Sequence, residues 1–168
     1  MSLVKLCGSD GSWQKVKTEW EKSCKKYNED FSNFGIASLP VLDGLAANPE
    51  KAARICGFRD DTGHAAVCQA NVTPLPGYTG PVLRVRMITL SPNYDFGEYP
   101  IDAYASVLGG LFGGILALSQ GDMQADHIKF HVRSPADFQF FRTFQAVLKE
   151  QGGFSSVKMQ GAWLYVTK

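Results

Sequence analysis

The sequence predicts an α+β fold with about seven strands and about four helices. The fold class follows from the way two kinds of segment alternate along the chain. Short β-branched and apolar runs alternate with segments whose apolar residues recur every three or four positions, so the periodicity switches between 2 and 3.6. No stretch is long and polar enough to separate two domains, and a chain of 168 residues can bury a substantial core. We therefore expect a single domain over residues 1–168.

The N-terminal part is expected to form a strand and then two helices. Residues 3–7 are short and apolar, and the sequence SDGS ends that strand. Residues 12–27 carry apolar side chains three and four positions apart, which predicts an amphipathic helix. Its lysines are interpreted as a solvated face, and the alternative is a positive rim that attracts an anionic ligand. A second, short helix is expected near residues 39–53.

A β-hairpin is predicted over residues 54–72, with a short turn at residues 61–63. A three-residue loop would place Cys56 opposite Cys68, close enough for a disulfide, whereas a loop one residue shorter would leave them unpaired. The sequence leaves this register open. The four cysteines contain no C-x-x-C pair and no zinc-ligand spacing, so no metal site is expected. Reduced thiols in a cytoplasmic protein are expected instead.

Next, the sequence predicts a strand at residues 82–90, an acidic and aromatic loop, and a glycine-rich helix at residues 103–119. Asp102 is expected to be the N-cap of that helix. The helix carries no charge and is apolar on every side, so it is either a core helix or a membrane span. Its two interleaved pairs of glycines would let a sheet approach closely. Together with the neighbouring strands they favour the core helix.

The C-terminal part is expected to form a strand, a helix and a closing hairpin. In DHIKFHV, residues 126–132, His127, Lys129 and His131 share one face, and two histidines four residues apart on a strand are ~13 Å apart, too far to share a metal. Ser134 and Pro135 predict a helix start, with an aromatic stripe that is expected in the core. The apolar strands of the closing hairpin are compatible with a homodimer.

Charge and composition set expectations about partners and location. The net charge of +1 gives no general attraction to nucleic acid or to a membrane surface, so neither is expected as a partner. No cationic start precedes an apolar run at the N-terminus, so no secretory signal is expected. A cytoplasmic protein is therefore predicted.

The predicted order, β-α-α-β-β-β-α-β-α-β-β, resembles that of the GNAT N-acetyltransferase superfamily over nearly the whole chain. Two segments carry the resemblance. LSPNYDFG, residues 90–97, is similar to the family's V-x-P-x-Y-R-G segment, with Pro92 and Tyr94 in register. FFRTFQAVLKEQGGF, residues 140–154, is similar to the family's F-Y-x-K-x-G-F ending.

The resemblance implies that the strands form a central, twisted, mostly antiparallel sheet. It also implies acetyl-CoA as the acyl donor and a small amine as the acceptor. It implies that the pantetheine arm lies along the strand that ends at Ile88, Thr89 and Leu90. The diphosphate would bind backbone amides around Gly97 and Ala103, because amide hydrogens and a helix dipole make an anion site.

The sequence departs from the family pattern in that loop. The family's Q/R-x-x-G-x-G/A glycines and arginine are replaced at residues 95–100 by DFGEYP, in which only Gly97 offers bare backbone. Carboxylates in this loop would repel a donor that carries several negative charges. Phe141 stands where the family's acid tyrosine is expected.

Catalytic candidates follow from the residues that remain. Glu98 or His131 is the candidate general base, since either needs only a modest shift to work near neutral pH. Tyr94 or Tyr99 is the candidate acid for the leaving thiolate. The sequence thus favours a divergent acyl-CoA-dependent N-acyltransferase. The alternatives are a GNAT-like binding module that does not bind CoA, and an unrelated α+β fold with a membrane-associated helix.

Overall fold

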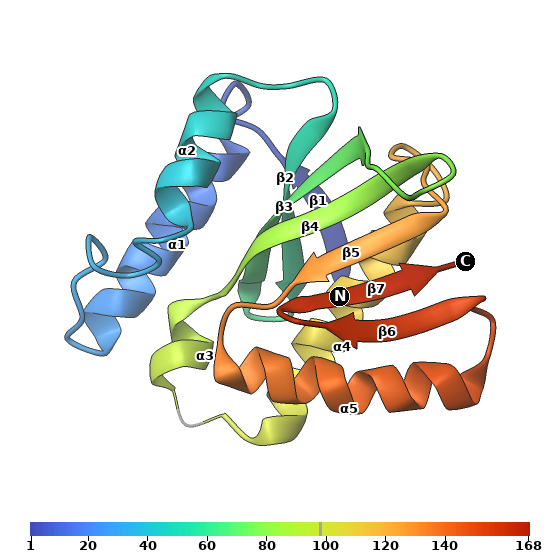
Figure 1. Ribbon diagram of the computed structural model, residues 1–168. Coiled ribbons are helices and arrows are strands. Elements are labelled where there is room, and N and C mark those ends of the chain that lie inside the picture. The colour runs from blue at the N-terminus through green and yellow to red at the C-terminus, as the bar shows by residue number, and fades with distance from the viewer. Residues whose placement is uncertain (98) are drawn as a thin grey trace.

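The computed structural model describes residues 1–97 and 99–168, apart from the side chain of Ala136 (Figure 1). These residues form one seven-stranded sheet in the order β1-β2-β3-β4-β5-β7-β6. Neighbouring strands are antiparallel except β4 and β5, which are parallel. The strands are β1 (Ser2–Leu6), β2 (Ala53–Asp60), β3 (Gly63–Pro74), β4 (Pro81–Leu90), β5 (His127–His131), β6 (Ser156–Gln160) and β7 (Trp163–Thr167). The predicted α+β class and the mixed, mostly antiparallel sheet are confirmed.

The described residues form five helices rather than about four. They are α1 (Ser12–Lys26), α2 (Leu39–Ala47), α3 (Pro92–Phe96), α4 (Ile101–Leu118) and α5 (Pro135–Gln151). The additional helix, α3, is a single turn between β4 and the glycine-rich helix. Pro92 begins it, and its fixed φ suits a first helical position. The expected cap of α4 is wrong, because Pro100 is the N-cap and Asp102 lies in the first turn, where its charge favours the helix dipole.

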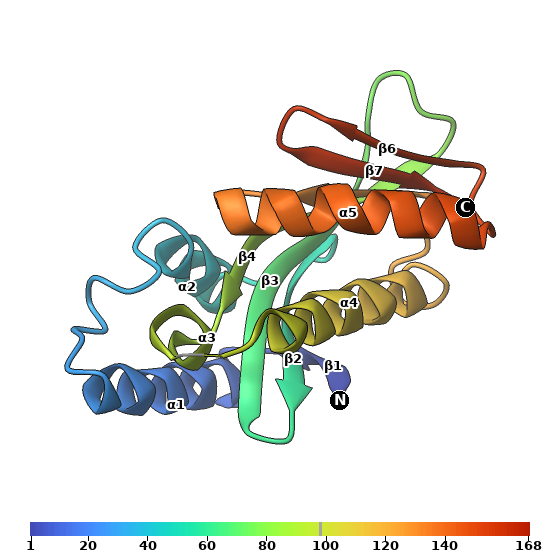
Figure 2. The ribbon, with the colours of Figure 1, turned by 90° about the horizontal axis from the view of Figure 1, so that it is seen from below.

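The helices form two layers, one on each face of the sheet. On one face, α1 and α2 pack against β2, β3 and β4, and the predicted stripe of α1 is buried there. On the other face lie α4 and α5, which Figure 2 shows next to each other. Phe130 of β5 stacks on Phe112 of α4 and on Phe141 of α5, so aromatic packing joins this second layer to the sheet.

The β2–β3 hairpin differs from both sequence expectations. Asp60 pairs with Gly63, so the loop has the shorter length that is expected to separate the cysteines. A β-bulge opposite Phe58 and Arg59 leaves one extra residue, Ala65, on β3, and Cys56 therefore pairs with Cys68. Both are free, buried thiols. Their hydrogen bond, together with burial, raises the pKa of Cys68.

The four glycines of α4 fall into two pairs, one that faces the sheet closely and one that faces open space. A Cβ on Gly110 would lie 2.3 Å from the Phe58 ring of β2, and one on Gly114 would lie 2.7 Å from Leu3 of β1. These two glycines allow the close helix–sheet contact that the sequence predicts. A Cβ on Gly109 or Gly113 would meet no atom within 4 Å. The helix is long and apolar enough to cross a membrane by composition, and 28% of it is buried. The buried residues are Val107, Leu108, Leu111, Phe112 and Ile115, which belong to the core of the protein.

Alanine substitutions at Gly110 and at Gly113 should therefore change the free energy of unfolding in opposite directions. We expect Gly110→Ala to lower the free energy of unfolding by about 1–3 kcal/mol, because the new methyl group overpacks against Phe58. Gly113→Ala should raise it by up to ~1 kcal/mol, because alanine restricts the unfolded helix segment and meets no obstacle. Urea denaturation of both variants measures this difference. Equal effects of the two substitutions would contradict the packing described.

Candidate functional site

The parallel strands β4 and β5 separate along part of their length. Their ladder ends at the pair Val85 and Phe130. Beyond it β4 stays paired with β3 as far as Leu90, while the Val132 N–H donates to the Ala162 carbonyl on the β7 side at 2.8 Å. Each strand thus follows its other neighbour, and the facing edges diverge.

A β-bulge in β4 marks the point of divergence. The β3–β4 register shifts between Val67 and Gln69, and Met87 adopts a left-handed conformation with φ of 54°. Left-handed backbone is uncommon outside glycine, and bulges bend a strand and increase its twist. The bulge redirects residues 88–90 away from β5.

A cavity of about 430 Å³ lies beyond this point, between the end of β4 and the β5–α5 connection. Its walls come from the segment before α2, the end of β4, α3, α4 and the β5–α5 connection. The lining residues are Asn33, Gly35, Ile36, Ala37, Ser38, Ile88, Thr89, Leu90, Asp95, Tyr104, Arg133, Ser134 and Asp137. Two side-chain hydrogen bonds hold the wall in place: Thr89 donates to the Ser38 hydroxyl at 2.7 Å, and Arg133 donates to the Ala37 carbonyl at 3.1 Å.

Two carboxyl groups and one phenol give this cavity its titratable character. Restricted hydration raises the pKa of Asp95 to about 6, and the negative charge of Asp137 adds to the effect. Water reaches Asp95 at the rim, but the surrounding atoms still limit its solvation. Burial also raises the pKa of Asp137, and hydrogen bonds with Ser134 oppose that rise.

Tyr104 of α4 carries the phenol of this cavity. Its hydroxyl donates to the Tyr94 carbonyl, and burial raises its pKa, with Asp95 and Asp137 contributing. The phenol therefore keeps its proton near neutral pH. The cavity thus combines a carboxyl group that ionises close to neutral pH with a hydroxyl group that does not.

The predicted donor-binding residues divide into two groups. Ile88, Thr89 and Leu90 line the cavity. Gly97 and Ala103 do not, and their amide hydrogens are used within the chain: the Gly97 N–H donates to Asn93 at 3.0 Å and the Ala103 N–H to Pro100 at 2.9 Å. The inserted α3 turn is the cause for Gly97, since that residue ends it.

The predicted catalytic residues do not gather in the cavity. Tyr94 is buried, its hydroxyl donates to Asp60 at 2.9 Å, and Tyr99 stacks on its ring at 4.7 Å between centroids. His131 lies on the sheet face with its imidazole 4.5 Å from the Trp163 ring. None of the three lines the cavity. Glu98 lies outside the described residues.

Sequence reasoning misses the cavity residues that carry its chemistry. The sequence presents Asp95 only as a repulsive charge and Asp137 only as part of a helix cap. Asp137 does take part in that cap, because its backbone N–H donates to the Ser134 hydroxyl at 3.0 Å. Tyr104 has a signal, since it is the one residue with an ionisable side chain in the uncharged segment 103–119. No group of three or more metal-binding side chains occurs among the described residues.

Comparisons with known proteins add the fold and no more. No family model and no curated protein matches the chain. A point mutant of the BH1408 protein from Bacillus halodurans is similar in structure, with a TM-score of 0.51, 15% identity, and coverage of 96% of this chain and 99% of that one. FeeM, an N-acyl amino acid synthase from uncultured soil microbes, gives a TM-score of 0.44 at 14% identity, covering 99% of this chain and 93% of that one. The chain has a divergent GNAT-like fold.

The raised pKa of Asp95 predicts a pH-dependent effect on stability. A carboxyl group whose pKa is about 6 in the folded state and 3.8 otherwise stabilises the fold below pH 3.8, and that contribution is lost as the pH rises through 6. Asp95→Asn should therefore raise the melting temperature relative to wild type above pH 6, and the difference should shrink on acidification. Thermal unfolding across this range measures it. Asp61→Asn in the hairpin loop is the control, and an equal gain there would contradict the assignment.

Proposed function

We propose that the protein is a divergent acyl-CoA-dependent N-acyltransferase that acts on a small amine. The observation that carries the proposal is the cavity between the end of β4 and the β5–α5 connection, bordered by the edge of residues 88–90. A strand edge offers N–H and C=O groups that an extended ligand with amide bonds can pair with, as an added strand does. The pantetheine arm of a thioester donor is such a ligand. The GNAT-like fold supports the same use of this cavity.

The side chains of the cavity fit the proton transfers of acyl transfer. The amine nitrogen attacks the thioester carbonyl, the C–N bond forms, and the C–S bond breaks as the thiolate leaves. Asp95 is the proposed base for the ammonium proton, because a pKa of about 6 leaves it ionised at neutral pH yet able to accept a proton. Tyr104 is the proposed acid for the thiolate, since its phenol remains protonated.

The nucleotide end of the donor finds less support. The amides of Gly97 and Ala103 already have carbonyl partners, and Asp102 places a negative charge in the first turn of α4. Donor affinity in this proposal therefore comes mainly from the pantetheine arm. These same features favour the second candidate, a GNAT-like binding module that does not bind CoA. Phe141 also favours it, since it is buried in the core and has no proton to give.

Calorimetric titration with acetyl-CoA and with acetyl-pantetheine separates the two candidates. The proposal expects both compounds to bind, with dissociation constants within about tenfold of each other, or ~1.4 kcal/mol, because the nucleotide adds little. Failure of both to bind at about millimolar concentration, which corresponds to roughly −4 kcal/mol, would leave the binding module as the better account.

Acyl transfer to a panel of small amines tests the proposed roles. Asp95→Asn should lower kcat by about 10²–10⁴-fold, the usual contribution of a general base, and should remove an acidic limb of the pH profile near pH 6. Tyr104→Phe should lower kcat while preserving donor binding. Tyr99→Phe is the matched control, because this tyrosine does not line the cavity. An Asp95→Asn enzyme with wild-type kcat would refute the assigned base.

A further inference from the structure

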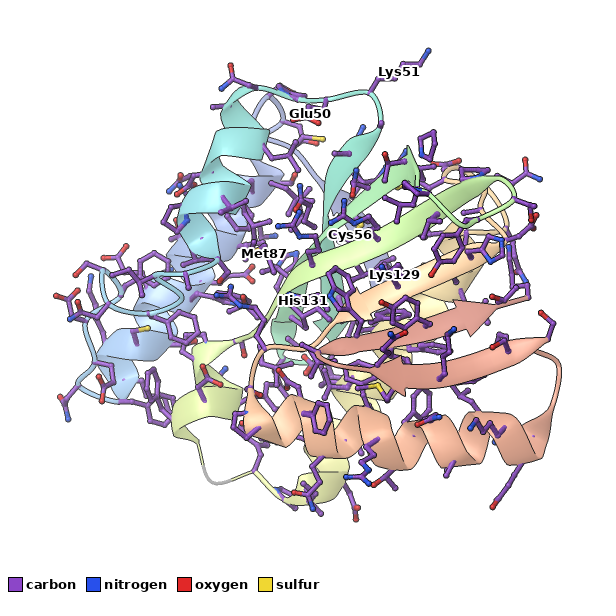
Figure 3. The ribbon with its side chains drawn as sticks, viewed as in Figure 1. Glu50, Lys51, Cys56, Met87, Lys129 and His131 are labelled. Atoms are coloured by element: carbon purple, nitrogen blue, oxygen red, sulfur yellow. The ribbon has the colours of Figure 1, made fainter. Side chains whose placement is uncertain are left out.

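One face of the sheet lacks a helix over its C-terminal half. In Figure 1, β4, β5, β7 and β6 face the viewer with no helix in front of them, whereas α1 and α2 lie to one side. Strand alternation and register determine which side chains share this open face. They are Arg84 and Arg86 of β4, His127, Lys129 and His131 of β5, Lys158 of β6, and Trp163 and Tyr165 of β7. Figure 3 shows Lys129 and His131 on it.

The strands of this face carry positive charge without acidic partners, and the nearby carboxyl groups Asp95 and Asp137 line the cavity with Arg133 without an ion pair to it among the described residues. The strands from β3 to β7 contain no aspartate or glutamate. None of the ion pairs found among the described residues involves an arginine or lysine of the open face, or Arg133 just beyond β5. Charges of one sign held close together repel, and the cost grows where water is partly excluded. The face is therefore poised to take a negative counter-charge.

The charge is most concentrated around His131. Burial lowers the pKa of its imidazole, and the nearby cations Arg133, Arg86 and Arg84 lower it further. Two nitrogens here, His131 Nδ1 and Arg84 Nε, are buried without a hydrogen-bond partner in the described part of the chain. Buried polar nitrogens are nearly always bonded. The Arg84 Nε–H can only donate, so it lacks an acceptor, whereas the role of His131 Nδ1 depends on the tautomer of the imidazole.

One residue of this cluster, Arg133, also lines the cavity. Arg86 and His131 are the first residues after the last β4–β5 pair, where the strands begin to diverge. Arg133 is anchored by Ala37 and by the Met87 sulfur at 3.4 Å. An anionic group held by these side chains would place the rest of a small molecule in the cavity.

We propose that Arg84, Arg86, His131 and Arg133 form a binding site for a carboxylate or phosphate group, and that this group belongs to the acyl acceptor. The acceptor is then a small amine that also carries a negative charge. The second part rests on the proposed function, whereas anion binding does not. Guanidinium groups suit this role because their fork of N–H donors matches the two oxygens of a carboxylate or phosphate.

The rest of the face favours a small anion over single-stranded nucleic acid. Bases bind such surfaces by stacking on aromatic rings. Here, Lys129 Nζ lies 4.8 Å from the Trp163 ring centroid and 4.5 Å from that of Tyr165, and Lys158 Nζ lies 5.6 Å from the Tyr165 ring. The faces of both rings therefore already carry cations.

Inorganic phosphate and acetate are the probes of this site. Their binding is measured by NMR of the His131 imidazole and by calorimetry. Either anion should raise the pKa of His131, since a bound negative charge stabilises the imidazolium. Arg86→Gln should weaken binding by about tenfold or more, and Arg86→Lys should restore part of it, since the charge returns without the fork. Arg142→Gln is the control: it removes one positive charge from an exposed position on α5 and should not change anion binding. Unchanged binding in Arg86→Gln, or no binding of either anion, would overturn the site.

Further arms separate this inference from the proposed function. An amino acid and the corresponding amine without the carboxylate are compared as acceptors. Wild type should have a lower KM for the amino acid, and Arg86→Gln should raise that KM while leaving the KM for the amine unchanged. Anion binding without acyl transfer would refute the proposed function but support the anion site. Acyl transfer to amines that carry no carboxylate, without anion binding, would refute the anion site but support the proposed function. A single-stranded oligonucleotide that binds more than about a hundredfold tighter than phosphate, and is weakened by Lys158→Gln, would overturn the small-ligand assignment.

Discussion

The separation of β4 from β5 shapes both the sheet and the candidate site. Two parallel strands normally continue side by side, but each of these keeps an antiparallel partner on its other edge, β3 or β7. The left-handed backbone at Met87 then turns β4 away from β5. The divergence exposes a strand edge and creates the cavity. Fold and candidate chemistry therefore have one physical origin.

Helix packing on the far face makes this divergence sustainable. Gly110 and Gly114 let α4 lie close against β1 and β2, so the core remains dense while the centre of the sheet opens. The aromatic stack around Phe130 does the same for β5. The open region is thus held between two rigid halves, which is the arrangement that a binding site needs if its groups are to stay in place.

The sequence predicts the elements better than their register. Helical spacing locates α1 and α5, because each buries one side. Apolar runs bounded by turn residues locate the strands, including β3, which is buried on both faces. These patterns miss α3, since a single turn is too short to show a period, and they misplace the cap of α4 as a result. They also cannot pair Cys56 with Cys68, because the pairing depends on a bulge that leaves no pattern in the residues.

For the site, local pattern and three-dimensional placement give different answers. Residues 88–90 can be predicted because they end a recognisable strand before a family-like segment. Asp95, Tyr104 and Arg133 cannot, because they come from three elements that meet only in the folded chain. Net charge is equally uninformative: a chain of +1 overall places Arg84, Arg86 and Lys129 together on one face of its sheet. Composition averages over the surface, whereas binding depends on how charge is distributed.

An NMR titration of the protein with acetyl-CoA that follows every backbone amide tests the proposed donor site most directly. We expect the largest shifts on Ile88, Thr89 and Leu90, with Asp95 and Tyr104 next, because the donor pairs with the free edge of β4. Saturable binding whose shifts fall instead on the apolar groove between α4 and α5, around Phe140 and Phe144, would contradict it. So would the absence of any shift.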